Sequence, residues 1–265
     1  MKKFEAFRPD FILAVVLVLL FSGPLARAQD NDVPAWRLSI TPIAPAPEDG
    51  LYSAGDDVEF WIDHQGARDN QGNSDNARMR FVGDEEIFYL TIDPSTLGGR
   101  ILKYDNGDAA LAVSSWGGVT LYTRDAPNGL PVERMGDAPN LDPEPVAANE
   151  LQEQALAITE ALEENENLEV AIAANWERVV RGNRVRALTI ESIRNATNAL
   201  AELASKRETR STLAERIRLV RIVVSDQSDI RVGNQTLTIS FDANGEPWDR
   251  PSSRAIIEAI ENSPR

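Results

Sequence analysis

The stretch from Arg100 to Val113, RILKYDNGDAALAV, decides the architecture of the first half of the chain. Apolar and polar residues alternate on both sides of its centre, which is the period of two that is typical of a half-buried strand. Asn106-Gly107 separates the two alternating runs, and both residues tolerate a positive φ angle. The stretch therefore predicts an antiparallel β-hairpin.

Further alternating runs extend this hairpin in both directions, with turn residues such as Gly98-Gly99 and Gly117-Gly118 between them. The predicted strands are 58–62, 79–82, 86–92, 100–104, 109–113 and 119–123. We predict an antiparallel meander of about six or seven strands, curled into a sandwich or a partial barrel, over residues 58–135. The Pro-rich residues 29–57 predict an extended entry segment, with one short strand at 36–40.

Residues 136–147 carry Pro139, Pro143 and Pro145 in a polar context and predict a linker. The composition then changes, and residues 148–265 predict an α+β region. Its expected elements are an amphipathic helix through Leu151–Leu162, a strand at 168–173, a helix at 190–204 capped by Thr189, a short helix at 212–216, strands at 217–224, 230–232 and 235–241, and a last helix capped by Ser252 or Ser253 and ending before Pro264. Gly233-Asn234 predicts the hairpin turn between the last two strands. The expected fold class is α+β, with a β-meander followed by a small helix-covered sheet in the order α-β-α-β-β-α.

Residues 1–28 have the layout of a cleavable signal peptide. A basic start at Lys2, Lys3 and Arg8 leads into eleven apolar residues, and Ala26-Arg27-Ala28 supplies the small residues of a cleavage site after Ala28. The apolar run is shorter than the roughly 20 residues that a membrane-spanning helix needs. The sequence thus predicts export to the periplasm or secretion, and no integral membrane segment in the mature chain.

The chain is acidic, with a formal net charge of −15, which becomes −17 without residues 1–28. This acidity disfavours nucleic acids and anionic lipid surfaces as partners, because phosphate binding depends on clustered Lys and Arg. Cysteine is absent, which excludes disulfides, thiolate chemistry and cysteine zinc sites. Residues 176–221 reverse the balance with 11 bases against 5 acids. This basic stretch either pairs with the chain's own acidic surface or forms a docking face for an acidic partner.

No catalytic constellation emerges from the motifs. The single histidine, His64, follows Asp63 in a predicted strand, and neighbouring strand residues point to opposite faces, so Asp63 would not orient His64 as in a catalytic triad. Residues 69–76 place oxygen side chains at alternate positions, as a calcium loop would. Ser74 and Arg80, however, stand where an EF-hand loop needs Gly and Glu, so a solvated turn is favoured. We assign no catalytic residue, cofactor or metal ligand from the sequence.

Two features, one tryptophan and the paired carboxylates, each allow two interpretations. Trp116, beside Gly117-Gly118, is either an exposed aromatic that stacks on a ligand or a residue that closes the end of a sandwich core. Paired carboxylates at Asp56-Asp57, Asp84-Glu85-Glu86 and Glu163-Glu164 could supply the two acids of a hydrolase, although such pairs are common in so acidic a chain.

A resemblance to a known family rests on the segments RFVGDEEIFYL (80–90), KYDNGD (103–108) and WGGVTLYTR (116–124), with 219–226, 235–241 and Arg250-Pro-Ser-Ser near the end. These segments resemble an uncharacterised family of exported Gram-negative bacterial proteins, classified as a domain of unknown function. The resemblance spans about 78–260. It implies export and one module that continues across the linker, and it implies no activity, cofactor or catalytic residue.

The sequence therefore favours an exported protein without catalytic activity that binds a protein partner or associates with the cell envelope. The alternative is a hydrolase that acts on an envelope substrate through carboxylates brought together only by the fold.

Overall fold

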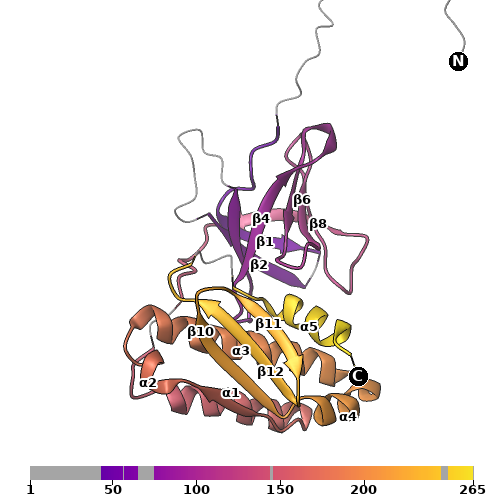
Figure 1. The fold of residues 1–265 in the computed structure, drawn as a ribbon. Helices are drawn as coiled ribbons and strands as arrows, with labels where there is room; N and C mark the ends of the chain where they lie inside the picture. The colour runs from indigo at the N-terminus through magenta and orange to yellow at the C-terminus, as the bar shows by residue number, and fades with distance from the viewer. Residues whose placement is uncertain (1–42, 56, 65–74, 144–145, 246–249, 265) are drawn as a thin grey trace, which may run out of the picture. The chain divides into compact units, whose positions relative to one another are not determined.

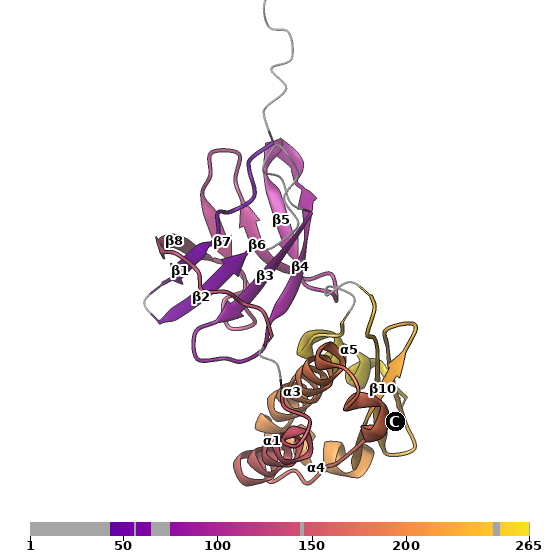
Figure 2. The same ribbon diagram turned by 90° about the vertical axis from the view of Figure 1, so that its left-hand side faces the viewer.

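Eight antiparallel strands within the described residues form a closed barrel, in which each strand pairs with the next along the chain and β1 pairs with β8 (Figures 1 and 2). The computed structural model describes residues 43–55, 57–64, 75–143, 146–245 and 250–264. The barrel strands are β1 (Gly50–Ala54), β2 (Val58–Asp63), β3 (Asn76–Phe81), β4 (Phe88–Pro94), β5 (Arg100–Lys103), β6 (Ala109–Val113), β7 (Val119–Leu121) and β8 (Leu130–Gly136).

Strand alternation sorts the barrel residues into an inner and an outer set. Phe60 and Ile62 of β2, Met79 of β3 and Leu90 of β4 point inward and are fully buried. Burying a large apolar side chain contributes about 1.5–3 kcal/mol, so these inward positions stabilise the barrel. The residues between them point outward, and this outer set supplies the side chains of the candidate site described below.

The closure of the barrel differs from the predicted sandwich or partial barrel. β1 lies within residues 29–57, predicted as an extended entry segment, and β8 begins with Leu130-Pro131. Neither strand was predicted, because a proline within a run argues against a strand and β1 has little alternating signal of its own. The two strands stabilise each other by pairing, with Ser53 opposite Glu133. The hairpin predicted at Asn106-Gly107 is confirmed, because β5 and β6 pair on either side of it.

The second half contains a four-stranded mixed sheet in the order β11-β12-β10-β9. β10 runs parallel to both of its neighbours, and β11 runs antiparallel to β12. The elements are α1 (Leu151–Glu166), β9 (Ala171–Ala174), α2 (Trp176–Val179), α3 (Asn183–Ser205), α4 (Arg207–Arg216), β10 (Leu219–Ser225), β11 (Asp229–Gly233), β12 (Thr236–Asp242) and α5 (Ser253–Asn262). α1, α3 and α5 cover one face of this sheet (Figures 1 and 2). The coarse α+β class is thus confirmed.

Two local predictions in this half were wrong, and one element was missed. α3 begins at Asn183, so Thr189 lies inside the helix, where its hydroxyl donates to the Val185 carbonyl oxygen at 2.8 Å instead of capping. The turn between β11 and β12 is formed by Asn234-Gln235, not by Gly233-Asn234, because these are the two residues with positive φ. The short helix α2 was not predicted. By contrast, the Ser252 cap of α5 is confirmed, since its side chain accepts from the Arg254 and Ala255 amides.

The barrel and the helix-covered sheet have separate hydrophobic cores, yet residues 41–265 form one compact unit. The segment predicted as a linker connects β8 to α1 and contributes buried side chains of its own. Leu141 is fully buried, and the Val146 carbonyl oxygen accepts from Arg186 Nε at 2.6 Å. This segment is therefore anchored to the rest of the protein at Leu141 and Val146, whereas a flexible linker would make no such contacts.

Two carboxylates from barrel loops hold the N-terminus of α5. Glu86, in the β3–β4 loop, accepts from the Ser253 amide at 2.8 Å and from the Asn198 side chain of α3 at 3.2 Å. Asp105, in the β5–β6 turn, accepts from the amide and the hydroxyl of Ser252. The first amides of a helix lack intrahelical acceptors, and its N-terminus favours negative charge. Three of the segments that carry the family resemblance thus meet at this one helix end.

Several expectations concern residues outside the described ranges. The signal peptide at 1–28, the strand at 36–40 and most of the oxygen-rich loop at 69–76 lie there. Among the described residues, none of the helices has the length and apolar character to cross a membrane.

Glu86 makes stability depend on pH. Burial raises the pKa of its carboxyl from the ordinary 4.5 to about 7, although the bonds from Ser253 and Asn198 oppose the shift. A raised carboxyl pKa contributes stability that is fully present below the unfolded pKa and is lost as pH rises through the folded pKa. A shift of this size corresponds to about 3 kcal/mol.

We therefore expect Glu86→Gln to gain stability relative to the wild type by about 3 kcal/mol between about pH 4 and pH 8. Urea unfolding across this range measures the difference. Glu85→Gln, which removes a neighbouring carboxyl that is 71 % exposed, is the matched control for loss of a charge. A difference between Glu86→Gln and wild type that is flat with pH would contradict the assignment.

Candidate functional site: an arginine-lined cleft

The outer faces of β2, β3 and β4 present a set of polar and aromatic side chains. Because inward and outward positions alternate, Arg78 and Arg80 lie on the same outer face of β3. Across the β2–β3 ladder, Asp63 is opposite Arg78 and Trp61 is opposite Arg80. Tyr89 of β4 is opposite Arg78 on the other side. One patch of the barrel wall therefore carries two guanidinium groups. Each has an aromatic residue opposite it on a neighbouring strand, Tyr89 for Arg78 and Trp61 for Arg80.

Arg78 is held between two carboxylates. It forms ion pairs with Asp63 and, at 2.7 Å, with Asp142 in the segment between β8 and α1. Burial alone would lower the pKa of Arg78, but the hydrogen bonds and charges of Asp142 and Asp63 outweigh it and raise the pKa above its ordinary value. Arg78 also lowers the pKa of Asp142, so this carboxyl stays ionised at neutral pH.

Glu191 of α3 forms a buried ion pair with Arg250, in the segment before α5. The side chains are only 14 % and 6 % exposed, and the Arg250 guanidinium lies 4.5 Å from the centre of the Tyr89 ring. Burial lowers the pKa of Arg250, and the nearby Arg184 and Arg78 act in the same direction. Three arginines from three distant segments therefore gather beside Tyr89.

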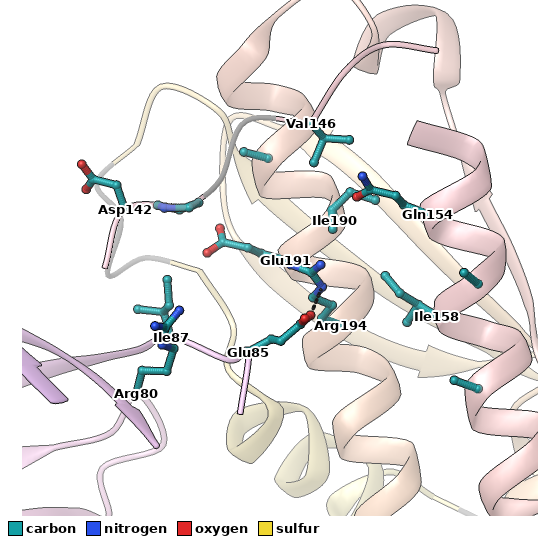
Figure 3. A pocket seen from close by; sticks show the side chains of 14 residues that line it. Arg80, Glu85, Ile87, Asp142, Val146, Gln154, Ile158, Ile190, Glu191 and Arg194 are labelled. Atoms are coloured by element: carbon teal, nitrogen blue, oxygen red, sulfur yellow. Dashed lines mark ion pairs between the residues drawn. The ribbon is translucent and has the colours of Figure 1, made fainter. Parts of the chain in front are cut away.

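A cleft of about 520 Å³ opens between this barrel wall, α1 and α3 (Figure 3). Its lining residues are Arg80, Glu85, Ile87, Asp142, Pro143, Val146, Gln154, Ala157, Ile158, Ala161, Ala187, Ile190, Glu191 and Arg194. A second cavity of about 410 Å³ adjoins it, shares Asp142, Pro143 and Ala187, and is also lined by Arg78, Arg184 and Arg250. Both volumes lie in the range of small-molecule sites. Five arginines thus line a continuous concave surface in a chain whose net charge is −15.

The carboxylates of the cleft are all engaged by arginines. Glu85 lies 2.8 Å from Arg194, and the dashed line in Figure 3 marks this pair. Asp142 is bound to Arg78, and Glu191 to Arg250. A carboxylate held in this way is a poor general acid, because the arginine favours its ionised form.

Arg80 differs from the other arginines of the cleft. Its guanidinium carbon lies 4.8 Å from the centre of the Trp61 ring, which fixes the side chain over the aromatic face. Its Nε is buried and finds no hydrogen-bond partner among the residues that the structure describes. Arg78 Nε is buried without a partner in the same way. What sets Arg80 apart from Arg78, Arg194 and Arg250 is that no carboxylate among the described residues pairs with it, so its charge is left for an anion that a ligand brings.

The basic stretch 176–221 has two roles in the structure. Much of it is paired within the chain, as first considered: Arg186 donates to the Val146 and Val180 carbonyls, and Arg210 pairs with Glu166. Arg216 binds the Ile260 and Ser263 carbonyls at the end of α5. Arg184 and Arg194 of the same stretch line the cleft, so part of it also faces a concave surface.

The residues weighed individually from the sequence lie mostly away from the cleft. His64 is buried and is bound to Asp49, whose Oδ1 lies 2.6 Å from Nδ1 and accepts the His64 amide at 3.0 Å. Asp63 turns instead to Arg78, as expected for adjacent strand residues. Trp116 is 88 % exposed, so it does not plug the barrel core. Within the described ranges, no group of three or more His, Asp or Glu side chains could hold a metal ion.

Sequence reasoning missed the arginines of the barrel wall. The order Arg78-Met79-Arg80 in a predicted strand would have placed two cations on one outer face, and this signal was available. Nothing local indicated that Arg250 would reach Glu191, 59 positions earlier, because only tertiary packing brings the two together.

Fold and site define an α+β protein with a closed barrel, a helix-covered mixed sheet and an arginine-lined cleft. The chain belongs to the family described as Domain of unknown function (DUF4908), whose model matches residues 39–260. The match confirms the resemblance to a domain-of-unknown-function family and extends over both the barrel and the helix-covered sheet. No curated protein and no solved structure matches the chain.

The Glu191–Arg250 pair gives a direct test of the packing that forms the cleft. We expect Arg250→Met to lower the free energy of unfolding by about 3 kcal/mol, because it leaves the buried Glu191 without its cation. The double variant Glu191→Leu/Arg250→Met should recover most of this loss. Chemical denaturation measures all three.

The control is Arg231→Met, which removes a β11 arginine that is 82 % exposed and should change stability by less than about 0.5 kcal/mol. A loss in the double variant as large as in the single one would show that the buried charge is not the cause.

Proposed function

We propose that this chain is an exported binding protein without catalytic activity, and that the arginine-lined cleft binds an anionic ligand. The observation that carries this proposal is Arg80, which lines the cleft and has no ion-pair partner among the described residues, whereas Arg78, Arg194 and Arg250 each pair with a carboxylate. A guanidinium binds carboxylate or phosphate oxygens through two parallel N–H donors, which gives both strength and orientation.

The state of the cleft carboxylates also favours binding over catalysis. Glu85, Asp142 and Glu191 face one cleft, which is the arrangement that a carboxylate-dependent hydrolase on an envelope substrate would need. Each of them, however, is already paired with an arginine. A general acid must hold a proton near neutral pH, and an adjacent cation works against this. The hydrolase hypothesis therefore has less support than ligand binding.

Export is the second part of the proposal and rests on the sequence. Residues 1–28 have the charged, apolar and small-residue regions of a signal peptide, and no cysteine near Ala28 offers a site for lipid attachment. An acidic chain without cysteine tolerates an oxidising compartment such as the periplasm.

Anion binding can be measured with inorganic phosphate as the probe. A Kd of about 1 mM and a phosphate concentration of about 10 mM would stabilise the folded state by about 1.4 kcal/mol. For a chain of this size we expect a rise in Tm of roughly 3–5 °C over sodium chloride of equal ionic strength. Arg80→Gln should abolish the rise.

Arg231→Gln is the matched control, because it removes an exposed arginine of β11 outside the cleft and should keep the full rise. An equal rise in Arg80→Gln and wild type would refute binding at Arg80, since a general salt effect would explain it.

Export can be tested in a Gram-negative host that expresses the full chain. We expect the periplasmic fraction to contain a protein whose intact mass corresponds to residues 29–265. Ala28→Arg should leave the precursor uncleaved, because the cleavage site needs a small residue there, and Asp30→Asn is the control beyond the cut. Recovery of the uncleaved wild-type chain from the cytosol alone would contradict export.

A further inference from the structure

The surface that the cleft exposes is more polar than apolar. Four separate parts of the chain bring polar side chains to it, which Figure 3 labels: Arg80 of β3, Asp142 of the segment after β8, Gln154 of α1 and Glu191 of α3. Ile190 borders the cleft beside them but is itself buried, so this part of the wall offers little apolar surface. A ligand that fills the cleft therefore has to replace the hydrogen bonds that water makes with these walls.

Asp142 and Glu191 supply acceptors to the cleft although each already binds an arginine. Asp142 pairs with Arg78, and Glu191 pairs with Arg250. An ionised carboxylate has two oxygens with about four lone-pair sites, so the bonds to the arginine leave part of its accepting capacity unused. Because both carboxylates line the cleft, this capacity is available to the donors of a ligand.

Gln154 adds donors and an acceptor to the same cleft. It is half-buried near the start of α1, and its side-chain amide makes no hydrogen bond to another residue that the structure describes. A glutamine amide carries two N–H donors and a carbonyl acceptor. The lining thus mixes donors with acceptors over a short distance.

The Glu85–Arg194 pair extends this mixed lining along the cleft. Its side chains are 71 % and 33 % exposed, and both border the cleft. The pair carries no net charge, so it favours neither an anion nor a cation. Its two ends nevertheless offer an acceptor and donors to whatever lies beside them.

The size of the cleft argues against a small inorganic ion as the whole ligand. A water molecule occupies about 30 Å³ in the liquid, so a single phosphate fills only a small part of about 520 Å³. The rest requires an organic body that exchanges hydrogen bonds with the mixed lining.

Hydroxyl groups match this lining best. A hydroxyl carries one O–H donor and two acceptor lone pairs, so it can pair with a carboxylate as well as with a guanidinium or an amide. An ammonium carries donors only, and Arg80 would repel its charge. The lining therefore favours a hydroxylated body over an amine.

We propose that the cleft binds an anionic sugar, with its carboxylate or phosphate group on Arg80 and its hydroxyls on Gln154, Asp142 and Glu191. This inference rests on the proposed anion-binding function and names the class of ligand. The shared chemistry is one anionic group on a polyhydroxylated ring, which either a sugar acid or a sugar phosphate supplies.

Isothermal titration calorimetry at constant ionic strength tests the inference with compounds built on a six-membered ring. Glucuronate and glucose 6-phosphate carry the hydroxyls and the anionic group, glucose carries the hydroxyls alone, cyclohexanecarboxylate carries the anionic group alone, and glucosamine carries a positive charge. We expect the Kd of glucuronate to be at least about tenfold lower than those of glucose and cyclohexanecarboxylate, which corresponds to about 1.4 kcal/mol. Glucosamine should bind most weakly.

Two variants separate the anionic group from the hydroxyls. Arg80→Gln should bind glucuronate no better than glucose, because the cation is lost. Gln154→Ala should weaken glucuronate by roughly two- to tenfold, as expected for one hydrogen bond, and should leave cyclohexanecarboxylate unchanged. Gln152→Ala, which removes the same side chain from an exposed position of α1, is the matched control and should behave as wild type.

The order of the two anionic sugars identifies the source of the charge. A lower Kd for glucose 6-phosphate than for glucuronate would assign the ligand to sugar phosphates, and the reverse order to sugar acids; both outcomes support the proposal.

The inference is overturned if cyclohexanecarboxylate binds as tightly as glucuronate, if glucosamine does so, or if Gln154→Ala and Gln152→Ala bind glucuronate alike. If inorganic phosphate nevertheless raises the Tm through Arg80, the proposed anion-binding function stands and only the sugar is excluded. If neither phosphate nor the anionic sugars depend on Arg80, both proposals fail.

Discussion

The cleft depends on the buried carboxylate of Glu86. This side chain comes from the β3–β4 loop of the barrel and accepts hydrogen bonds from the first residue of α5 and from Asn198 of α3. Burial opposes its charge, whereas the amides of the helix N-terminus favour it, and the raised pKa shows that burial is the larger of the two effects. Because the neighbouring residues Glu85 and Ile87 line the cleft, the position of its barrel side follows from this contact.

Ion pairs of arginines hold most of the other segments that surround the cleft in place. Arg78 joins β3 to the segment after β8 through Asp142, and Arg250 joins the start of α5 to α3 through Glu191. The Arg250 guanidinium lies over the Tyr89 ring, and Arg78 is opposite Tyr89 in the β3–β4 ladder. These pairs cost desolvation, but removing one partner would cost more, because a buried charge would then remain alone.

Arg80 is the exception that gives the cleft its proposed role. It lies on the same outer face of β3 as Arg78, two residues away, yet a tryptophan stands opposite it where an aspartate stands opposite Arg78. Because Arg80 faces an aromatic ring and not a carboxylate, its guanidinium is held in place by Trp61 but its charge is not neutralised. This difference separates a structural arginine from one that can bind a ligand, and it makes recognition of an anion a more natural task for the cleft than proton transfer.

The amino-acid sequence by itself determined the α+β class, the hairpin at Asn106-Gly107, the Ser252 cap of α5 and the membership of a domain-of-unknown-function family. These features depend on residues close together in the chain, so alternation, turn chemistry and capping reveal them. The tertiary structure alone decided the closure of the barrel and the make-up of the cleft. β1 and β8 carry weak signals and gain their stability by pairing with each other across the chain, and Arg80, Glu191 and Arg250 acquire their roles only through partners that packing brings to them.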